Sequence, residues 1–216
     1  MPNHEEFYLA EPSGPGRAGV LVAHDWYGLL PHVRTACDEL AAAAGLVALA
    51  PDLYDGRSTT DPEQAEALQQ ATEALDTAKA RARLDAATAA LRERTVGGPV
   101  GGLGFSMGGF HTLLQATTGA YDAIAVYYAT LDEEQAASIH CPVLLHMAEE
   151  DEFDPRETYE GFAAALKAAG TEVQSHTWPG TEHSFANGDV ALYAPKPAAE
   201  AWSITVQFLR DHLGSP

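Results

Sequence analysis

One serine of the chain lies in a glycine-rich segment, Gly104–Gly109, whose sequence is Gly-Phe-Ser-Met-Gly-Gly. The apolar run 99–103 before it is typical of a strand, and the apolar run 110–116 after it is typical of a helix. Glycines two positions to either side of Ser106 fit a tight strand-to-helix turn, because the chain passes very close to itself there. Such a turn exposes the serine hydroxyl at the positive end of the helix, where it could act as a nucleophile. The alternative is a glycine-rich turn that only permits close packing.

A serine hydroxyl is a weak nucleophile near neutral pH, so this chemistry requires a histidine base and a carboxylate that orients the histidine. Five carboxylates lie in the loop 148–155 after an expected strand, and His183 is the only histidine of the loop 179–185 after the next one. Ser106, Asp151 and His183 therefore occur in the order nucleophile, acid, base, which is typical of α/β-hydrolases. Taken alone, an acidic loop is also typical of solvated surface, and a single histidine is common in turns.

Short apolar runs alternate with longer helical patterns along most of the 216 residues. This alternation predicts an α/β fold with a mostly parallel central sheet, helices on both faces and a single domain over 1–216. Most of the expected strands are almost continuously apolar, which indicates burial on both faces of the sheet. We expect strands at 7–9, 19–24, 46–50, 100–104, 124–128, 143–147 and 173–178, and helices at 31–44, 62–71, 75–93, 107–117, 156–169 and 197–213.

The amino-acid composition argues against several classes of protein. Hydrophobic residues make up 46% of the chain and charged residues 20%, which is enough apolar material for a sizeable core. The balance of 31 Asp and Glu against 12 Lys and Arg gives a net charge of −19, which repels nucleic acids and anionic lipid surfaces. Cys37 and Cys141 lie in apolar stretches, which argues against a disulfide framework. We expect a cytoplasmic protein, monomer or homodimer, with no nucleic-acid or membrane partner.

Four parts of the chain together resemble the dienelactone hydrolase family, and the resemblance runs from about residue 7 to residue 213. They are 22–28 (Val-Ala-His-Asp-Trp-Tyr-Gly), 50–54 (Ala-Pro-Asp-Leu-Tyr), 104–109 around Ser106, and the acid and base segments 145–151 and 182–186. The resemblance implies an α/β-hydrolase fold with Asp151 as the acid of the triad, and the position of Asp151 after its strand agrees. The Met107 N–H, at the start of a helix, is placed to stabilise an oxyanion. The resemblance implies the N–H of Trp26 as the second donor.

Asp154 competes with Asp151 for the role of the acid. Asp154 directly precedes Pro155, and proline is favoured in the first turn of a helix. We therefore interpret Asp154 as the N-cap of a helix over 155–169, its carboxylate accepting N–H groups of that helix.

Three positions depart from the best-known members of that family. This chain has Ser106 where they have cysteine, Asp25 where they have glutamate, and Asn187 where they have arginine. Without that arginine a bidentate clamp for a substrate carboxylate is missing, so we expect neutral esters to be preferred over anionic ones. Arg57 could supply a cation instead, or it could be an ordinary surface arginine.

The segment 129–140 is too short to hold a lid domain, which favours a shallow site and small substrates. We expect Asp25, Tyr54, Arg57 and Phe185 to contact the substrate. The sequence predicts hydrolysis of a small ester, lactone or thioester through an acyl-enzyme, with no cofactor and no metal ion. The alternatives are an acyl-CoA or peptide hydrolase that uses the same triad, and a non-catalytic module that binds a small ligand.

Overall fold

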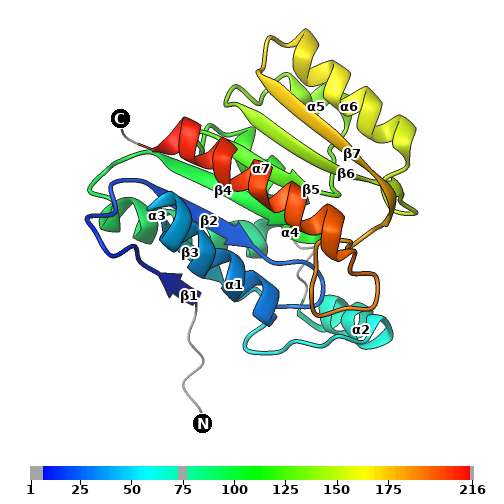
Figure 1. The fold of residues 1–216 in the computed structure, drawn as a ribbon, viewed down its shortest axis with the longest axis horizontal. Coiled ribbons are helices and arrows are strands. Elements are labelled where there is room, and N and C mark those ends of the chain that lie inside the picture. Colours follow the sequence, from blue (N-terminus) through cyan, green and yellow to red (C-terminus); the bar gives the residue numbers. More distant parts are fainter. Residues whose placement is uncertain (1–6, 73–76, 215–216) are drawn as a thin grey trace.

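The computed structural model describes residues 7–72 and 77–214. Within them the strands form one sheet in the order β1-β3-β2-β4-β5-β6-β7 (Figure 1). The strands are β1 (Phe7–Ala10), β2 (Gly19–Ala23), β3 (Val47–Pro51), β4 (Val100–Phe105), β5 (Ile124–Tyr127), β6 (Val143–Glu150) and β7 (Val173–Glu182). β1 is antiparallel to β3, and every other neighbouring pair is parallel. The predicted α/β architecture with a mostly parallel sheet is confirmed.

Helices cover both faces of this sheet. α1 (Pro31–Glu39) and α7 (Pro195–Leu213) lie across the near face in Figure 1. α3 (Thr77–Arg94) and α4 (Met107–Ala116) supply buried side chains to the core on the opposite face. The other helical segments of the described residues are the π-helical turn Leu40–Ala44, α2 (Pro62–Thr72), α5 (Glu133–Ala136) and α6 (Arg156–Ala168).

The strand β2 shows how the sheet divides the core. Val20 and Val22 pack in the cluster that includes side chains of α1 and α7, whereas Leu21 and Ala23 pack in the cluster that includes those of α3 and α4. Alternate side chains of a strand point to opposite faces of the sheet. A strand covered on both faces is therefore apolar at every position, which is the pattern that the sequence shows.

β6 and β7 run further than expected. The sequence predicts that they end at 147 and 178, whereas they end at Glu150 and Glu182, which pair with each other beyond an irregularity that starts at Ala148. The last residues of these strands are mostly exposed and polar, so the apolar pattern stops before the strands do. This extension carries Asp151 and His183 to the same end of the sheet.

Smaller differences concern the helices. α7 begins two residues earlier than expected, and residues 75 and 76 of the expected helix 75–93 lie outside the described residues. The segment between β5 and β6 contains the short helix α5, which the sequence does not predict. No helix within the described part of the chain has the length and apolar character needed to cross a bilayer.

Candidate active site

The turn between β4 and α4 holds Ser106 in a strained backbone conformation. Ser106 has a φ of +49°, a left-handed value that is costly for residues other than glycine. A Cβ atom at Gly104 would collide with the carbonyl group of Gly108, and one at Gly108 would collide with that of Ala23. The close approach of the chain therefore requires both glycines, and the structure contains the tight turn that the sequence predicts.

A chain of hydrogen bonds links Ser106 to two other strand ends. Its Oγ lies 2.7 Å from Nε2 of His183, and Nδ1 of His183 lies 2.9 Å from each carboxylate oxygen of Asp151. Asp151 follows β6 and His183 follows β7, so the parallel strands bring together residues that are far apart in the sequence. When Nδ1–H donates to the carboxylate, Nε2 is free to accept the serine hydroxyl proton. This is the arrangement of a nucleophile, a base and an orienting acid.

Asp151 is held in place by more than the histidine. Tyr159 of α6 donates its hydroxyl to Oδ2, and the backbone N–H groups of Phe153 and Asp154 donate to Oδ1, each at 3.0 Å. Burial alone would raise the pKa of Asp151, but the hydrogen bond and charge of His183 and the two backbone N–H groups outweigh it and lower that pKa. The carboxylate therefore stays charged and oriented toward His183.

Asp154 does not cap α6, so this expectation from the sequence is wrong. The N-cap of α6 is Pro155, which makes no side-chain capping bond. Asp154 instead accepts a hydrogen bond from the hydroxyl of Thr130. The physical reason is that α6 begins at Arg156 with Pro155 at the N-cap, so Asp154 lies one position before the residue that could cap the helix.

A cavity of about 340 Å³ opens beside Ser106 and His183. Its other lining residues are Trp26, Gln69, Met107, Phe110, Tyr128, Ala129, Thr130, Phe153 and Asp154. The walls are thus mainly aromatic and aliphatic, and Asp154 is the one carboxylate among the lining residues. Among the described residues that line the cavity there is no lysine or arginine, so a substrate carboxylate would meet no permanent cation there.

Phe153 partly covers the cavity. Its ring lies 4.7 Å from the ring of His183 and 5.9 Å, edge to face, from the ring of Trp26, measured between centroids. Phe153 nevertheless keeps 56% of its surface exposed, which is unusual for a large apolar side chain. Sequence reasoning missed this residue. The available signal was one aromatic residue within a loop of five carboxylates.

The two residues expected to donate backbone N–H groups to an oxyanion, Trp26 and Met107, both line this cavity. Trp26 follows β2 in a turn that is fixed by hydrogen bonds from the N–H groups of Tyr27 and Gly28 to Asp25. Met107 is the first residue of α4. The structure therefore places both residues at the cavity that Ser106 lines, and their role as an oxyanion hole stays a prediction.

The four residues expected to contact the substrate are not among those that line this cavity. Asp25, Tyr54 and Phe185 are fully buried, and none of them lines the cavity. The Tyr54 hydroxyl donates to the sulfur of Met107 at 3.7 Å, so Tyr54 supports the cavity from behind. Phe185 packs in the core against Trp178. Arg57 is exposed on the loop after β3, and its Nε donates to a backbone carbonyl at 3.2 Å.

The sheet, the serine turn and the order of acid and base along the chain define the class of this protein, which is an α/β-hydrolase. The sequence model of the dienelactone hydrolase family matches residues 6–213, and the chain belongs to this family.

Individual relatives match nearly the whole chain. Protein usf of Aquifex pyrophilus is 31% identical over 218 residues, which cover 95% of this chain and 93% of the relative. A Bradyrhizobium protein with the name "Probable 2-oxo-3-(5-oxofuran-2-ylidene)propanoate lactonase" is 28% identical, with 95% of this chain and 89% of the relative covered. Among solved structures, a dienelactone hydrolase-like promiscuous phosphotriesterase from metagenomic libraries has the same fold. It matches with a TM-score of 0.79 at 24% identity and covers 94% of this chain and 89% of its own.

Proposed function

We propose that this chain hydrolyses small carboxylic esters or lactones through an acyl-enzyme formed on Ser106. The observation that carries the proposal is the hydrogen-bonded chain from Ser106 through His183 to Asp151 at the wall of a cavity. Membership of the dienelactone hydrolase family and the likeness to a relative named as a lactonase support the same class of reaction.

In the first half of the reaction, Ser106 Oγ attacks the carbonyl carbon of the substrate while its proton moves to Nε2 of His183. Asp151 keeps Nδ1–H in place and stabilises the charged imidazole. The tetrahedral intermediate then collapses, and His183 delivers the proton to the leaving oxygen. In an ester this oxygen departs as an alcohol, whereas in a lactone it remains attached to the acyl group. The product of this half is an acyl-serine.

In the second half, water repeats the attack. His183 accepts a proton from the water, the hydroxide adds to the acyl carbon, and the proton returns to Ser106 Oγ as the carboxylic acid leaves. In both halves the carbonyl oxygen becomes negatively charged. The N–H groups of Met107 and Trp26 would bind this oxyanion, and loss of one such donor typically costs about 3 kcal/mol of transition-state stabilisation.

The lining of the cavity supports small substrates without a carboxylate. Its aromatic walls can desolvate a short acyl or alcohol group. An anionic group would instead meet the Asp154 carboxylate and an overall charge of −19. Thioesters of small acids are compatible with the same chemistry.

The decisive experiment is labelling with a fluorophosphonate, which reacts covalently with an activated serine. The label should attach to Ser106 in the wild type, should be absent from Ser106→Ala, and should persist in Ser203→Ala. Ser203 is a suitable control because it is an exposed serine of α7 whose hydroxyl donates to the backbone carbonyl of Ala199. A wild-type protein that takes no label and hydrolyses no ester, lactone or thioester would instead be a non-catalytic binding module.

A further inference from the structure

The carboxylate of Asp154 is a charged group of the catalytic cavity that the proposed reaction does not use. It lines the cavity together with Ser106, whereas the triad acid is Asp151. One of its oxygens accepts the hydroxyl of Thr130, another lining residue. It caps no helix. Within the part of the chain that the structure describes, one side-chain hydrogen bond holds Asp154 at the cavity wall, and its carboxylate is available to a ligand.

The surroundings of Asp154 favour a positively charged ligand. Burial and the charge of Asp151 raise the pKa of Asp154, whereas the hydrogen bond from Thr130 and the charge of His183 act in the opposite direction by favouring the charged form. The nearest basic residue along the chain, Arg156, pairs with Glu160 at 2.7 Å on the exposed side of α6. A cation bound in the cavity would therefore neutralise a carboxylate that no described lining lysine or arginine neutralises.

The remaining walls fit the same kind of group. The rings of Trp26, Phe110 and Phe153 border the cavity, and aromatic faces attract organic cations through their quadrupole. Trp26 and Phe153 contact each other edge to face, so they form one continuous aromatic wall. A carboxylate next to an aromatic wall is a combination that suits an alkylammonium group better than a neutral group of the same shape.

We propose that Asp154 makes the cavity selective for esters that carry an ammonium group. This inference rests on the proposed function, because it names the class of substrate that the same site takes. Asp154 is then a specificity-determining residue: it contacts the ammonium group of the substrate and takes no part in bond cleavage.

The test compares two esters of equal shape, acetylcholine and 3,3-dimethylbutyl acetate. Acetylcholine carries a positively charged nitrogen at the position where 3,3-dimethylbutyl acetate has a neutral carbon. In the wild type the ratio of kcat/KM for the charged ester to that for the neutral ester should be about ten or more, which corresponds to about 1.4 kcal/mol. Asp154→Asn should lower this ratio about tenfold. Asp154→Ser provides a second variant of smaller size in case the Asn variant folds poorly.

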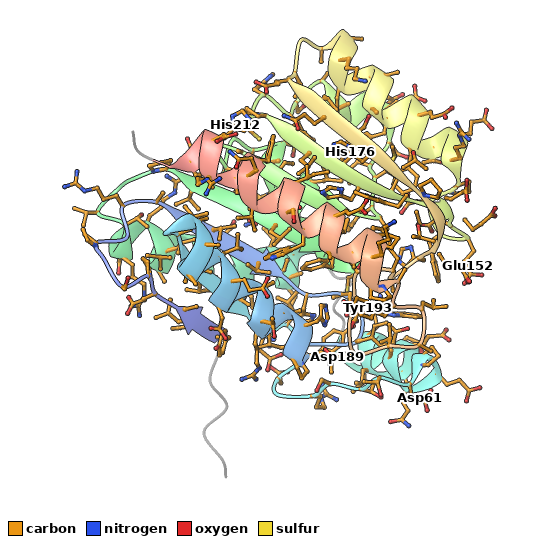
Figure 2. The ribbon with its side chains drawn as sticks, in the orientation of Figure 1. Asp61, Glu152, His176, Asp189, Tyr193 and His212 are labelled. Carbon is orange, nitrogen blue, oxygen red and sulfur yellow. The ribbon has the colours of Figure 1, made fainter. Side chains whose placement is uncertain are left out.

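Glu152→Gln is the matched control. It removes the same charge from the same loop, but Glu152 is exposed, does not line the cavity and lies at the periphery of the molecule in Figure 2. The ratio should stay at its wild-type value in Glu152→Gln. A wild-type ratio near one, or an equal drop in the Glu152 and Asp154 variants, would overturn the proposal, because the preference would then be absent or would come from overall charge.

A binding measurement separates this proposal from the proposed function. Choline and 3,3-dimethylbutanol are titrated by calorimetry into Ser106→Ala with and without Asp154→Asn. Choline should bind Ser106→Ala about tenfold more tightly than the neutral alcohol, and Asp154→Asn should remove the difference. If neither ester is cleaved but this binding pattern is found, the hydrolase function is wrong and the cation site stands. Equal binding of both alcohols overturns the cation site, whether or not esters are cleaved.

Discussion

Asn187 donates a hydrogen bond from its side-chain Nδ2 to Oδ2 of Asp25 over 2.8 Å, and both residues are fully buried. These are two of the positions at which the sequence departs from the best-known members of the dienelactone hydrolase family. The smaller pair Asp and Asn thus forms an internal bond where those members have glutamate and arginine. Neither residue reaches the cavity beside Ser106. The bond instead fixes the turn after β2 that carries Trp26.

Replacing Asn187 with arginine should therefore create no substrate clamp. A larger side chain at a fully buried position should cost about 1–3 kcal/mol of stability through overpacking. The kcat/KM for an ω-carboxylate ester, relative to its neutral analogue, should not rise. Urea unfolding and the two rate constants test this, with Asn187→Gln as the variant that retains the amide. A stable Asn187→Arg protein with a clear gain on the anionic ester would show that position 187 faces the substrate.

Asp151→Asn should lower kcat by a factor on the order of 10⁴, because His183 would lose the group that selects its tautomer. The structure adds a cost in stability, since the Tyr159 hydroxyl also donates to this carboxylate. Loss of a hydrogen bond to a charged group costs about 2 kcal/mol, so the melting temperature should fall as well. Kinetics and thermal melts of Asp151→Asn and Glu152→Gln test both parts. An active Asp151→Asn enzyme would exclude Asp151 as the acid.

Asp151 and Asp154 should affect the pH dependence of stability in opposite directions. The pKa of Asp151 is lowered in the folded protein, so its contribution is complete above the unfolded pKa, about 4, and is lost as pH falls through the folded pKa. Burial raises the pKa of Asp154, so the charged form of Asp154 destabilises the folded protein. This destabilisation develops as pH rises through the raised pKa.

Thermal melts between about pH 3 and pH 7 can separate these two effects, because the range spans the ordinary pKa of aspartate. Asp151→Asn should weaken the fall in melting temperature toward low pH. Asp154→Asn should raise the melting temperature at neutral pH more than at acid pH. If melting temperature depends on pH in the same way in both variants, the two pKa values are not shifted in opposite directions.

The sequence is sufficient to predict how Ser106, Asp151 and His183 come together, because each follows a strand and parallel strands end at one edge of the sheet. The sequence is not sufficient to predict in which direction the side chains point in the loops that follow these strands. Phe185 lies two residues after His183, but Ser184 has a φ of +68°, and the chain beyond this left-handed residue directs Phe185 into the core. No local sequence pattern predicts a serine with a left-handed backbone conformation.

The loop 148–155 shows a second limit of prediction from sequence. Asp154 before Pro155 has the sequence of a helix cap, and that interpretation fails because α6 begins one residue later, with Pro155 itself at the N-cap. The exact residue at which a helix begins depends on the three-dimensional geometry of the loop before it. Asp154 instead lies at the cavity beside Thr130, a position that only the structure could show.

Phe153→Ala should widen the range of acyl chains that the site accepts. The Phe153 ring spans from His183 to Trp26, and its removal opens the cavity on that side. With p-nitrophenyl esters, the wild type should work best at about four acyl carbons or fewer, and the variant at longer chains. Leu192→Ala is the control, because Leu192 is a similarly exposed apolar residue that does not line the cavity. An unchanged optimum in Phe153→Ala would show that this ring does not limit chain length.

Loss of the hydroxyl group should change the stability of the protein differently at two adjacent buried tyrosines, Tyr127 and Tyr128. The Tyr127 hydroxyl lies 2.7 Å from Oγ1 of Thr205, which also bonds to His146, so Tyr127→Phe should cost about 1 kcal/mol. The Tyr128 hydroxyl is buried with no hydrogen-bond partner among the described residues, so Tyr128→Phe removes an unsatisfied polar group and keeps the ring beside His183. Its stability should equal or exceed that of the wild type, because an unsatisfied buried group costs about 1–3 kcal/mol. Urea unfolding of both variants is the measurement, and a clear loss of stability in Tyr128→Phe would mean that this hydroxyl is bonded in solution.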